Sequence, residues 1–267
     1  MNRFAPEERV LVSPRHPAGA GPDQLADALG PLIHLFGWPT QHDATTGHIA
    51  VDSPDHSLRI DFEPGRYDGI WWTIAHHEPY WEAEFTRQTP IEAIAAVTQA
   101  LPQLLGDRRH TERIPLTALA LTEIAHLNHW AAGEENGTLT SPDRHCLLRH
   151  APGDERPWRF QHRVHDGFDT HWHASFTRDT PERLVAQFFV HLSTTAPVER
   201  AFRDVPHLVQ GLDDALITPV RGAAVNRMPT TPAPRSTAPY GCADTAALTT
   251  VRPAGLPAVT DVRPMTR

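Results

Sequence analysis

Lysine is absent from the 267-residue chain, and cysteine occurs only twice. All 24 basic residues are arginine, and 32 acidic residues leave a formal net charge of -8. This balance argues against a protein that coats nucleic acid through an overall positive field. Cys146 and Cys242 form no CxxC pair and predict no disulfide framework, so we expect both to be free thiols.

Long apolar runs are also missing. No segment approaches the roughly 20 apolar residues that a membrane-spanning helix requires. The first ten residues, MNRFAPEERV, lack the apolar core of a signal peptide. We therefore expect a cytoplasmic protein that does not enter a membrane.

Motifs that identify a catalytic or cofactor site are lacking as well. The chain has no G-x-S-x-G nucleophile elbow, no phosphate-binding P-loop and no motif that pairs a cysteine with an activating histidine. Gly19-Ala20-Gly21 resembles the start of a dinucleotide loop, but Gln24 stands where the third glycine is needed. The sequence therefore predicts no catalytic residue and no cofactor.

What the chain does contain is an internal repeat. The tetrapeptide at Ser53–His56 returns 88 positions later at Ser141–Arg144, with only its last residue changed. Phe85–Arg87 returns 91 positions later as Phe176–Arg178, and each of these tripeptides is followed, one residue further on, by Thr-Pro. Length changes belong in loops, so we place the three extra residues in the turn before the last strand of the second copy. The chain is two diverged tandem copies.

Each copy predicts the same α+β unit. In the first copy an apolar helical pattern over residues 25–36 precedes four short strands, and a second helix follows them. Antiparallel neighbours in a meander are the simplest connection. The expected strands are residues 48–53, 57–63, 70–76 and 80–86.

The second helix of the first copy has a clear start signal. Thr89 is the expected N-cap, Pro90 the first helical residue, and Glu92 the partner that completes a capping box. The second copy keeps Thr-Pro but has Arg183 in place of the glutamate.

These patterns define the expected domains. The first repeat covers residues 8–106 and the second, more diverged repeat covers residues 112–216. Residues 218–267 are rich in Pro, Thr and Ala and lack periodicity, so we expect a disordered tail.

A set of short motifs, mainly in the first repeat, is distinctive. The motifs are Val12–Arg15, Gly37-Trp38, Ser53–Asp55, Trp71-Trp72, Trp81, Phe85 and Thr89–Glu92. They resemble the domain-of-unknown-function family 317 (DUF317), over residues 8–106 and more loosely over residues 114–195. The resemblance implies an actinobacterial, Streptomyces-like source, paired copies and a link to mobile elements. It implies no activity and no catalytic residue.

Strand alternation assigns the residues of each sheet to a core face or an open face. The open face is acidic in the first repeat and basic in the second, with Asp61 matched by Arg149 and Glu82 by His173. His162 falls on the core side, where we expect a hydrogen-bonded buried residue. We expect the interaction residues on the open faces to be Trp71, Asp61, Glu82, Glu84, Arg149, Arg159 and Arg163.

This contrast favours a noncatalytic protein-interaction or regulatory module. We expect the acidic and basic faces to meet, within one chain or between chains, with an apolar contact from Trp71. Otherwise we expect them to bind another protein. Two alternatives stay open. The faces are simply solvated, as charged sheet faces usually are, or the basic face of the second repeat binds nucleic acid through its arginines.

A group of histidines carries a further alternative, a metal-dependent enzyme. His171 and His173 form a His-x-His pair on a predicted strand, and a hairpin turn brings His165 near them. Imidazole nitrogen suits zinc, and Asp166 or Asp169 can add an oxygen ligand. The spacing matches no standard zinc motif, so a polar sheet face is the simpler interpretation.

Overall fold

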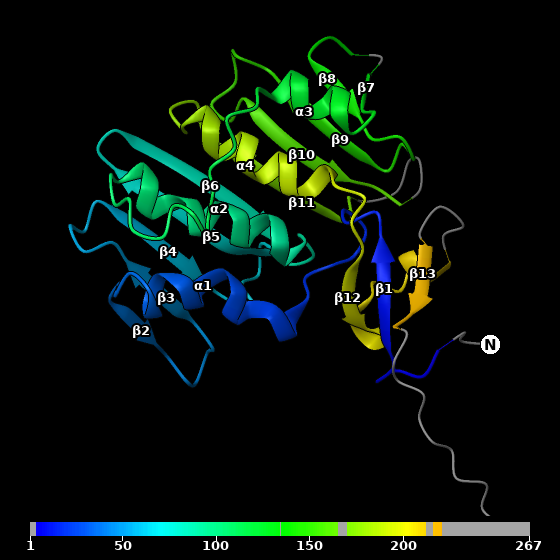
Figure 1. Cartoon of the computed structure of the whole chain (residues 1–267), viewed down its shortest axis with the longest axis horizontal. Coiled ribbons are helices and arrows are strands. Elements are labelled where there is room, and N and C mark those ends of the chain that lie inside the picture. Colours follow the sequence, from blue (N-terminus) through cyan, green and yellow to red (C-terminus); the bar gives the residue numbers. More distant parts are fainter. Residues whose placement is uncertain (1–3, 134, 165–169, 212–215, 221–267) are drawn as a thin grey trace, which may run out of the picture. The chain divides into compact units, whose positions relative to one another are not determined.

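The computed structural model describes residues 4–133, 135–164, 170–211 and 216–220. Within these ranges, four α-helices and two antiparallel sheets form an α+β structure (Figure 1). The larger sheet has ten strands and the smaller sheet has three. None of the described helices is long and apolar enough to cross a membrane.

The first repeat builds one half of the ten-stranded sheet. Helix α1 (Leu25–His34) precedes the strands and helix α2 (Ile91–Leu104) follows them. Each strand pairs antiparallel with the next along the chain, which makes a meander. The strands are β2 (Thr40–His42), β3 (Ile49–Asp52), β4 (Leu58–Phe62), β5 (Ile70–His77) and β6 (Tyr80–Thr86).

The second repeat builds the other half in the same order. Helix α3 (Leu121–Leu127) precedes its strands and helix α4 (Glu182–Ser193) follows them. Sequential antiparallel pairing makes a second meander. The strands are β7 (Ala131–Ala132), β8 (Thr138–Thr140), β9 (Cys146–His150), β10 (Trp158–His162) and β11 (Trp172–Phe176).

The two repeats share one sheet, which corrects the expectation of two separate four-stranded sheets. Strand β6 pairs antiparallel with β11, so the strand order is β2-β3-β4-β5-β6-β11-β10-β9-β8-β7. The physical reason is that the last strand of each meander presents unpaired backbone groups, and pairing the two strands removes both edges. Side-chain alternation carries no information about which edges meet.

An approximate two-fold axis follows from this pairing. Phe85 lies opposite Ala174, and Phe176 lies opposite Ala83. Because Phe85 and Phe176 are equivalent in the two repeats, the register is the same when the repeats are exchanged. The axis passes between the central pair, Glu84 and Ser175.

The register also corrects the sequence alignment of the repeats. His76 pairs with Trp81 in the first repeat, and His162 pairs with Trp172 in the second. His76 is therefore the equivalent of His162, 86 positions apart. The β9–β10 turn is therefore shorter than the equivalent β4–β5 turn, and the β10–β11 turn is longer than the β5–β6 turn. The sequence comparison, which placed one three-residue insertion before the last strand, did not reveal these two changes.

The repeated threonines explain how the repeats join. Thr86 Oγ1 accepts a hydrogen bond from His173 N at 2.9 Å and donates one to His173 O at 3.0 Å. At the equivalent place, Thr177 Oγ1 accepts from Glu82 N at 2.7 Å, while Thr177 N donates to Glu82 O at 2.9 Å. Each threonine extends the β6–β11 ladder with its own side chain. The repeated tripeptide is therefore a junction motif.

The threonines before the helices also bond across the junction, which corrects the capping-box prediction. Thr89 Oγ1 donates to His173 O and Thr180 Oγ1 donates to Glu82 O, each at 3.4 Å. Helix α2 begins at Ile91 after Pro90, without a side-chain cap. The hydroxyl of Thr89 therefore bonds to His173 of the other repeat and does not cap the helix.

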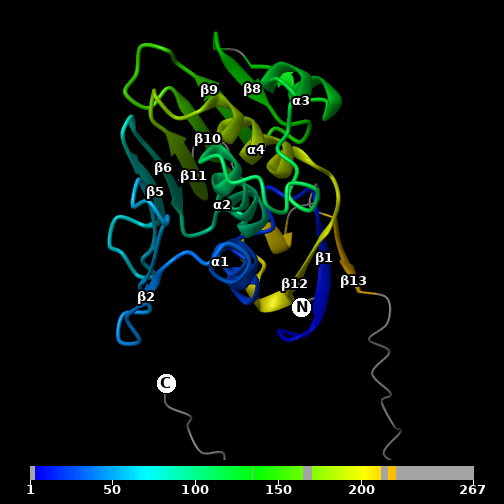
Figure 2. The ribbon, with the colours of Figure 1, turned by 60° about the vertical axis from the view of Figure 1, so that its left-hand side comes forward.

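One hydrophobic core serves both repeats. All four α-helices lie on one side of the ten-stranded sheet (Figure 2), and buried residues of both halves form a single cluster. Near the axis Phe188 of α4 packs at 5.4 Å from Phe85 and at 4.8 Å from Phe160, between ring centres. Burying one such ring contributes about 1.5–3 kcal/mol, so the junction is held by its core as well as by its backbone.

The three-stranded sheet takes strands from both predicted repeat ranges. Its central strand is β1 (Arg9–Ser13), flanked by β12 (Val198–Ala201) and β13 (Leu216–Pro219). The described ranges also contain three short 3-10 helices, η1 (Pro22–Gln24), η2 (Phe202–Asp204) and η3 (Val209–Gly211). Strand β13 runs two residues into the predicted tail, and residues 221–267, with Cys242, lie outside the described residues.

A buried ion pair ties the two sheets together. Arg200 of β12 is 1% exposed, and its guanidinium contacts both carboxylate oxygens of Glu92 at 2.7 Å. Arg200 also donates to Gln24 Oε1 at 2.6 Å. Two parallel charged hydrogen bonds hold this geometry firmly. Glu92, predicted to cap a helix, instead anchors the small sheet.

Candidate functional site

The face of the ten-stranded sheet opposite the helices presents the charged side chains that the sequence singled out. Its charge changes sign along a single row that crosses every central strand. The register places in this row Asp61, Thr73, Glu84, Ser175, Arg159 and Arg149, from β4 to β9. We call this surface the open face.

The two halves of the open face carry opposite charge. In the first repeat six carboxylates stand beside two guanidinium groups, those of Asp52, Asp61, Glu63, Asp68, Glu82 and Glu84 against Arg59 and Arg66. In the second repeat four guanidinium groups stand beside one carboxylate, those of Arg149, Arg156, Arg159 and Arg163 against Asp154. The halves lie side by side in one sheet, so within one chain they do not face each other.

One arginine crosses the junction between the halves. Arg156, in the turn before β10, forms an ion pair with Glu82 and a second one with Glu84 at 3.0 Å. Burial raises the pKa of Glu84, Arg156 opposes that rise, and Glu82 adds to it. Sequence reasoning missed Arg156 because alternation assigns faces only to strand residues.

Internal pairing leaves one charge unbalanced on each side. Glu82 and Glu84 share the single guanidinium of Arg156. In the second repeat the situation is reversed, because Arg149 and Arg159 both approach Asp154 at 3.8 Å. Asp61 contacts Arg59 at 2.8 Å and His48 at 2.9 Å, and Arg59 also approaches Asp52 at 3.4 Å.

A polar hollow of about 270 Å³ lies at the axis of the open face. Its lining includes Glu84, Arg156, Arg159, Gln161 and His173. Burial lowers the pKa of His173, and the charges of Arg159 and Arg156 lower it further. A site flanked by two guanidinium groups repels a metal cation, so His173 is poorly placed as a metal ligand.

Of the predicted histidine group, His171 and His173 lie in different surroundings. His171 turns to His162, with 3.2 Å between the two Nδ1 atoms, whereas His173 lines the hollow. His165, Asp166 and Asp169 lie outside the described residues. Among the residues that the structure does describe, no three His, Cys, Asp or Glu side chains are placed to hold a metal ion.

His162 is buried, as its core-side position predicted, within a cluster of imidazoles. It is 0% exposed, and burial holds its pKa well below the usual value, with nearby His16 and His171 lowering it further. Burial also lowers the pKa of His171 to about 4. Beside them His16 Nε2 contacts Asp143 Oδ2 at 2.7 Å. The pKa of Asp143 is low although burial opposes this, because His16 and Ser141 stabilise its charged form.

Trp71 lies apart from the acidic residues with which it was grouped. A β-bulge between Ile70 and Trp72 takes it out of regular alternation. The Arg87 guanidinium lies 5.0 Å from its ring centre, and the ring lines a hollow of about 290 Å³ together with Arg203 and His207. Alternation could not reveal a bulge.

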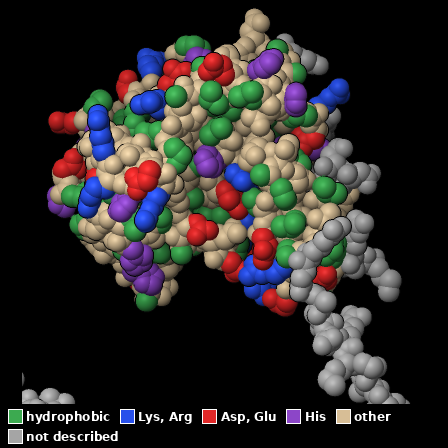
Figure 3. All heavy atoms as spheres, in the orientation of Figure 1, with side chains coloured by type: hydrophobic (Ala, Val, Ile, Leu, Met, Phe, Trp, Pro, Cys, Tyr) green, Lys and Arg blue, Asp and Glu red, His purple; other side chains and the backbone are tan. Residues whose placement is uncertain are grey.

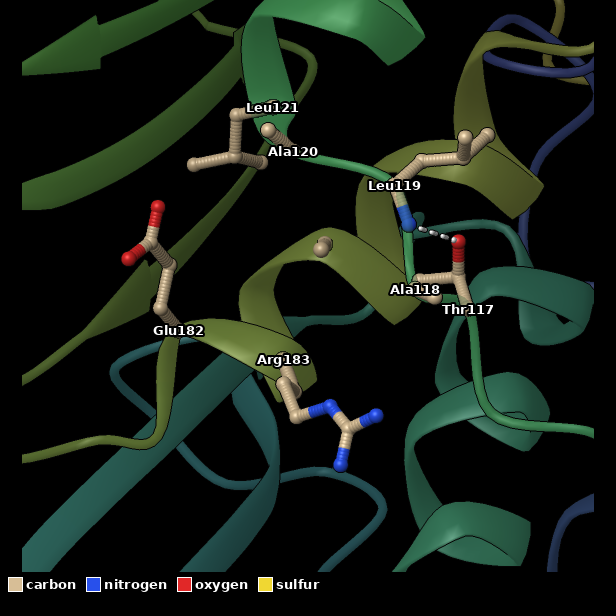
Figure 4. Close-up of a pocket in the computed structure, with 8 residues that line it drawn as sticks. Thr117, Ala118, Leu119, Ala120, Leu121, Glu182 and Arg183 are labelled. Carbon is tan, nitrogen blue, oxygen red and sulfur yellow. Dashed lines mark hydrogen bonds between the residues drawn. The ribbon is translucent and has the colours of Figure 1, made fainter.

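The helix side offers weaker candidates. Figure 4 shows a pocket of about 190 Å³ between the segment leading into α3 and the first turn of α4, where Glu182 and Arg183 extend in different directions. Hydrophobic side chains gather near α3 on the surface shown in Figure 3. Leu119, just before this helix, and Leu127, its last residue, are 38% and 62% exposed. Small-molecule sites usually measure about 300–1,000 Å³. The pocket in Figure 4 is smaller than that, whereas the hollow over α3 measures about 360 Å³ and offers few polar groups, Thr122, Glu123 and His126.

Comparison with known proteins gives a family and no function. The family model of the SPDY domain, a domain of unknown function (DUF317), matches residues 52–103 and 140–198. Each match begins beside the turn formed by the repeated Ser-Pro-Asp and extends past the junction motif. The first match ends within α2, and the second runs through α4 to the start of β12. No curated protein and no solved structure matches the chain. One segment in each repeat thus matches the SPDY domain, a domain of unknown function (DUF317), which is consistent with two tandem copies.

Proposed function

We propose that the protein is a noncatalytic interaction module that binds another protein surface through the open face. The observation that carries this proposal is the change of charge along one continuous row of the ten-stranded sheet. Complementary charge steers encounter and fixes the orientation of a partner. The hollow of about 270 Å³ at the axis adds hydrogen-bonding groups.

A second copy of the chain is the favoured partner. Rotation by 180° about an axis parallel to the strands, between two facing sheets, places the first repeat of one chain over the second repeat of the other. The unbalanced carboxylate beside Arg156 then faces the unbalanced guanidinium beside Asp154, twice. Rotation about an axis across the strands brings like charges together and is disfavoured.

Nucleic acid is a weaker alternative. Arg149, Arg159 and Arg163 offer positive charge for phosphate contacts. They occupy only one half of the face, and the carboxylates of Glu82 and Glu84 in the adjoining half repel a phosphate backbone. A metal-dependent enzyme is less favoured still, since His171 and His173 have different surroundings.

The test is charge reversal on the open face. We expect the Arg149→Glu/Arg159→Glu variant to lose a concentration-dependent dimer that the wild-type protein forms at low ionic strength, measured by sedimentation velocity. The matched control, Arg113→Glu/Arg183→Glu, changes the same number of charges away from this face and should keep the dimer. Weakening of the wild-type dimer in 0.5 M salt is the further expected result, because exposed charges are screened.

Three outcomes would count against this proposal. A dimer that survives in the open-face variant removes the face as the interface. The proposal of an interaction module is also wrong if the wild-type protein stays monomeric and captures the same proteins from its host as the variant does. If the wild-type protein, but not the variant, retains a nucleic-acid oligomer in a salt-dependent way, the result supports the nucleic-acid alternative instead.

A further inference from the structure

The Ser-Pro-Asp turn has the same hydrogen bonds in both repeats. Ser53 Oγ donates to Asp55 Oδ1 at 2.6 Å and accepts from Leu58 N at 3.0 Å. In the second repeat Ser141 Oγ donates to Asp143 Oδ1 at 2.6 Å and accepts from the equivalent amide at 2.9 Å. The turn uses only one carboxylate oxygen, so Oδ2 stays available in each repeat.

A histidine stacked on a tryptophan occurs at the equivalent strand end of each repeat, so the two pairs lie at opposite ends of the shared sheet. His76 lies parallel to Trp81 with ring centres 5.7 Å apart, and His162 lies parallel to Trp172 at 5.9 Å. These residues are equivalent in register. The aspartate and the stacked pair together form what we call the strand-end site.

In the second repeat the chain fills this site with its own segment after β1. His16 Nε2 contacts Asp143 Oδ2 at 2.7 Å, and the indole nitrogen of Trp172 donates to the carbonyl oxygen of His16 at 2.9 Å. His16 is followed by Pro17 and is only 2% exposed. One histidine therefore satisfies both the aspartate and the tryptophan.

In the first repeat the same site is not filled by the described residues. Asp55 is exposed, and its Oδ2 makes no hydrogen bond with them. Trp81 is 4% exposed, and its indole nitrogen has no hydrogen-bond partner among the described residues. Neighbouring Tyr80 is 57% exposed at the tip of the β5–β6 hairpin, at the upper left of Figure 1.

We propose that the strand-end site of the first repeat binds a short segment of a partner protein that carries histidine followed by proline. The histidine side chain contacts Asp55 Oδ2, and the carbonyl of the same residue accepts the Trp81 indole N–H, as His16 does in the second repeat. Hydrogen bonds from Ser53 and Ser57 hold the pKa of Asp55 at about 2, so its acceptor oxygen is ionised.

The occupant is a segment of another protein and not the same segment of a second chain. The segment after β1 is already engaged in its own chain, where Arg15 Nη1 also donates to His191 O at 2.7 Å. The site lies at the strand ends, away from the row of charges on the open face. This inference therefore stands or falls separately from the proposed function.

The probe is a synthetic peptide with the sequence of residues 11–20, LVSPRHPAGA, added to the full chain. We expect saturable movement of the Trp81 indole ¹H-¹⁵N NMR signal, assigned with Trp81→Phe, and no movement of the Trp172 signal. Asp55→Asn keeps the Oδ1 acceptor of the turn and should weaken binding about tenfold, as for a lost charged hydrogen bond. A peptide with alanine in place of its histidine should weaken binding similarly.

The matched control is Asp179→Asn, an exposed aspartate elsewhere, which should bind the peptide as the wild type does. Binding of equal strength by Asp55→Asn, or no movement of the Trp81 signal at saturation, overturns the proposal. Movement of the Trp172 signal alone shows displacement of the internal segment and also overturns it. A wild-type dimer that Asp55→Asn abolishes identifies a second chain as the occupant and overturns the choice of partner.

Discussion

The two repeats share their internal framework and differ in what surrounds it. Both have the Ser-Pro-Asp turn, the stacked histidine and tryptophan, and the threonine that bonds across the junction. Only the second repeat has its strand end filled by the segment after β1. The features that both repeats share therefore define the domain. The positions at which the repeats differ decide which surface stays available for binding.

The largest difference between the repeats is expected at matched positions of α2 and α4, the second helix of each repeat. Glu92 pairs with buried Arg200, whereas its counterpart Arg183 is exposed. Glu92→Ala leaves an uncompensated buried charge and should lower the free energy of unfolding by about 3–5 kcal/mol. Arg183→Ala should change it by less than about 0.5 kcal/mol. Urea unfolding of both variants checks this, and equal losses would contradict the anchoring role of Glu92.

The junction threonines test the two-fold relation itself. Thr86→Val and Thr177→Val each leave a backbone amide of the partner repeat without its acceptor, at His173 and Glu82. Each should cost about 1–3 kcal/mol of unfolding free energy. The exposed Thr122→Val serves as control. Thermal and urea unfolding that showed a large loss for only one of the junction threonines would argue against equivalent roles.

Acid should destabilise the second repeat selectively. The pKa of His171 is lowered by burial to about 4, below the ordinary value of 6.5. The unfolded chain therefore binds more protons in this window, and stability falls as the pH drops from 6.5 towards 4. Its counterpart in the first repeat is Tyr80, which stays neutral over this range.

The measurement is urea unfolding at pH 7 and pH 4.5. His171→Phe should reduce the acid-dependent loss of unfolding free energy by on the order of 1 kcal/mol. His126→Gln, at an exposed position of α3, should leave the loss unchanged. An unaltered pH dependence in His171→Phe would show that another group carries it.

The smallest effect is expected on the open face. Arg149 and Arg159 are 43% and 42% exposed in their side chains, and they approach Asp154 only at 3.8 Å. Replacing both with glutamate should change the unfolding free energy by no more than about 1 kcal/mol. Circular dichroism during thermal unfolding provides the check. A large loss would mean that the loss of dimer in this variant reports folding instead of binding.

Part of this arrangement was predictable from local patterns. The repeats, the α+β class and the core-side position of His162 follow from sequence periodicity, because side chains alternate along strands. Trp71 escaped that logic at a β-bulge, and Arg156 escaped it in a turn. Predicted capping by Thr89 and Glu92 failed because each found a tertiary partner, His173 and Arg200, far away in the chain.

Repeated turn and core residues demand the same local structure twice, so two copies of one α+β unit follow from the residue pattern alone. The pairing of β6 with β11, which joins the copies into one sheet, does not follow from that pattern. The same holds for the segment after β1, which fills one strand end and leaves the other open. Such choices depend on backbone edges and on partners distant in sequence, and local periodicity contains neither.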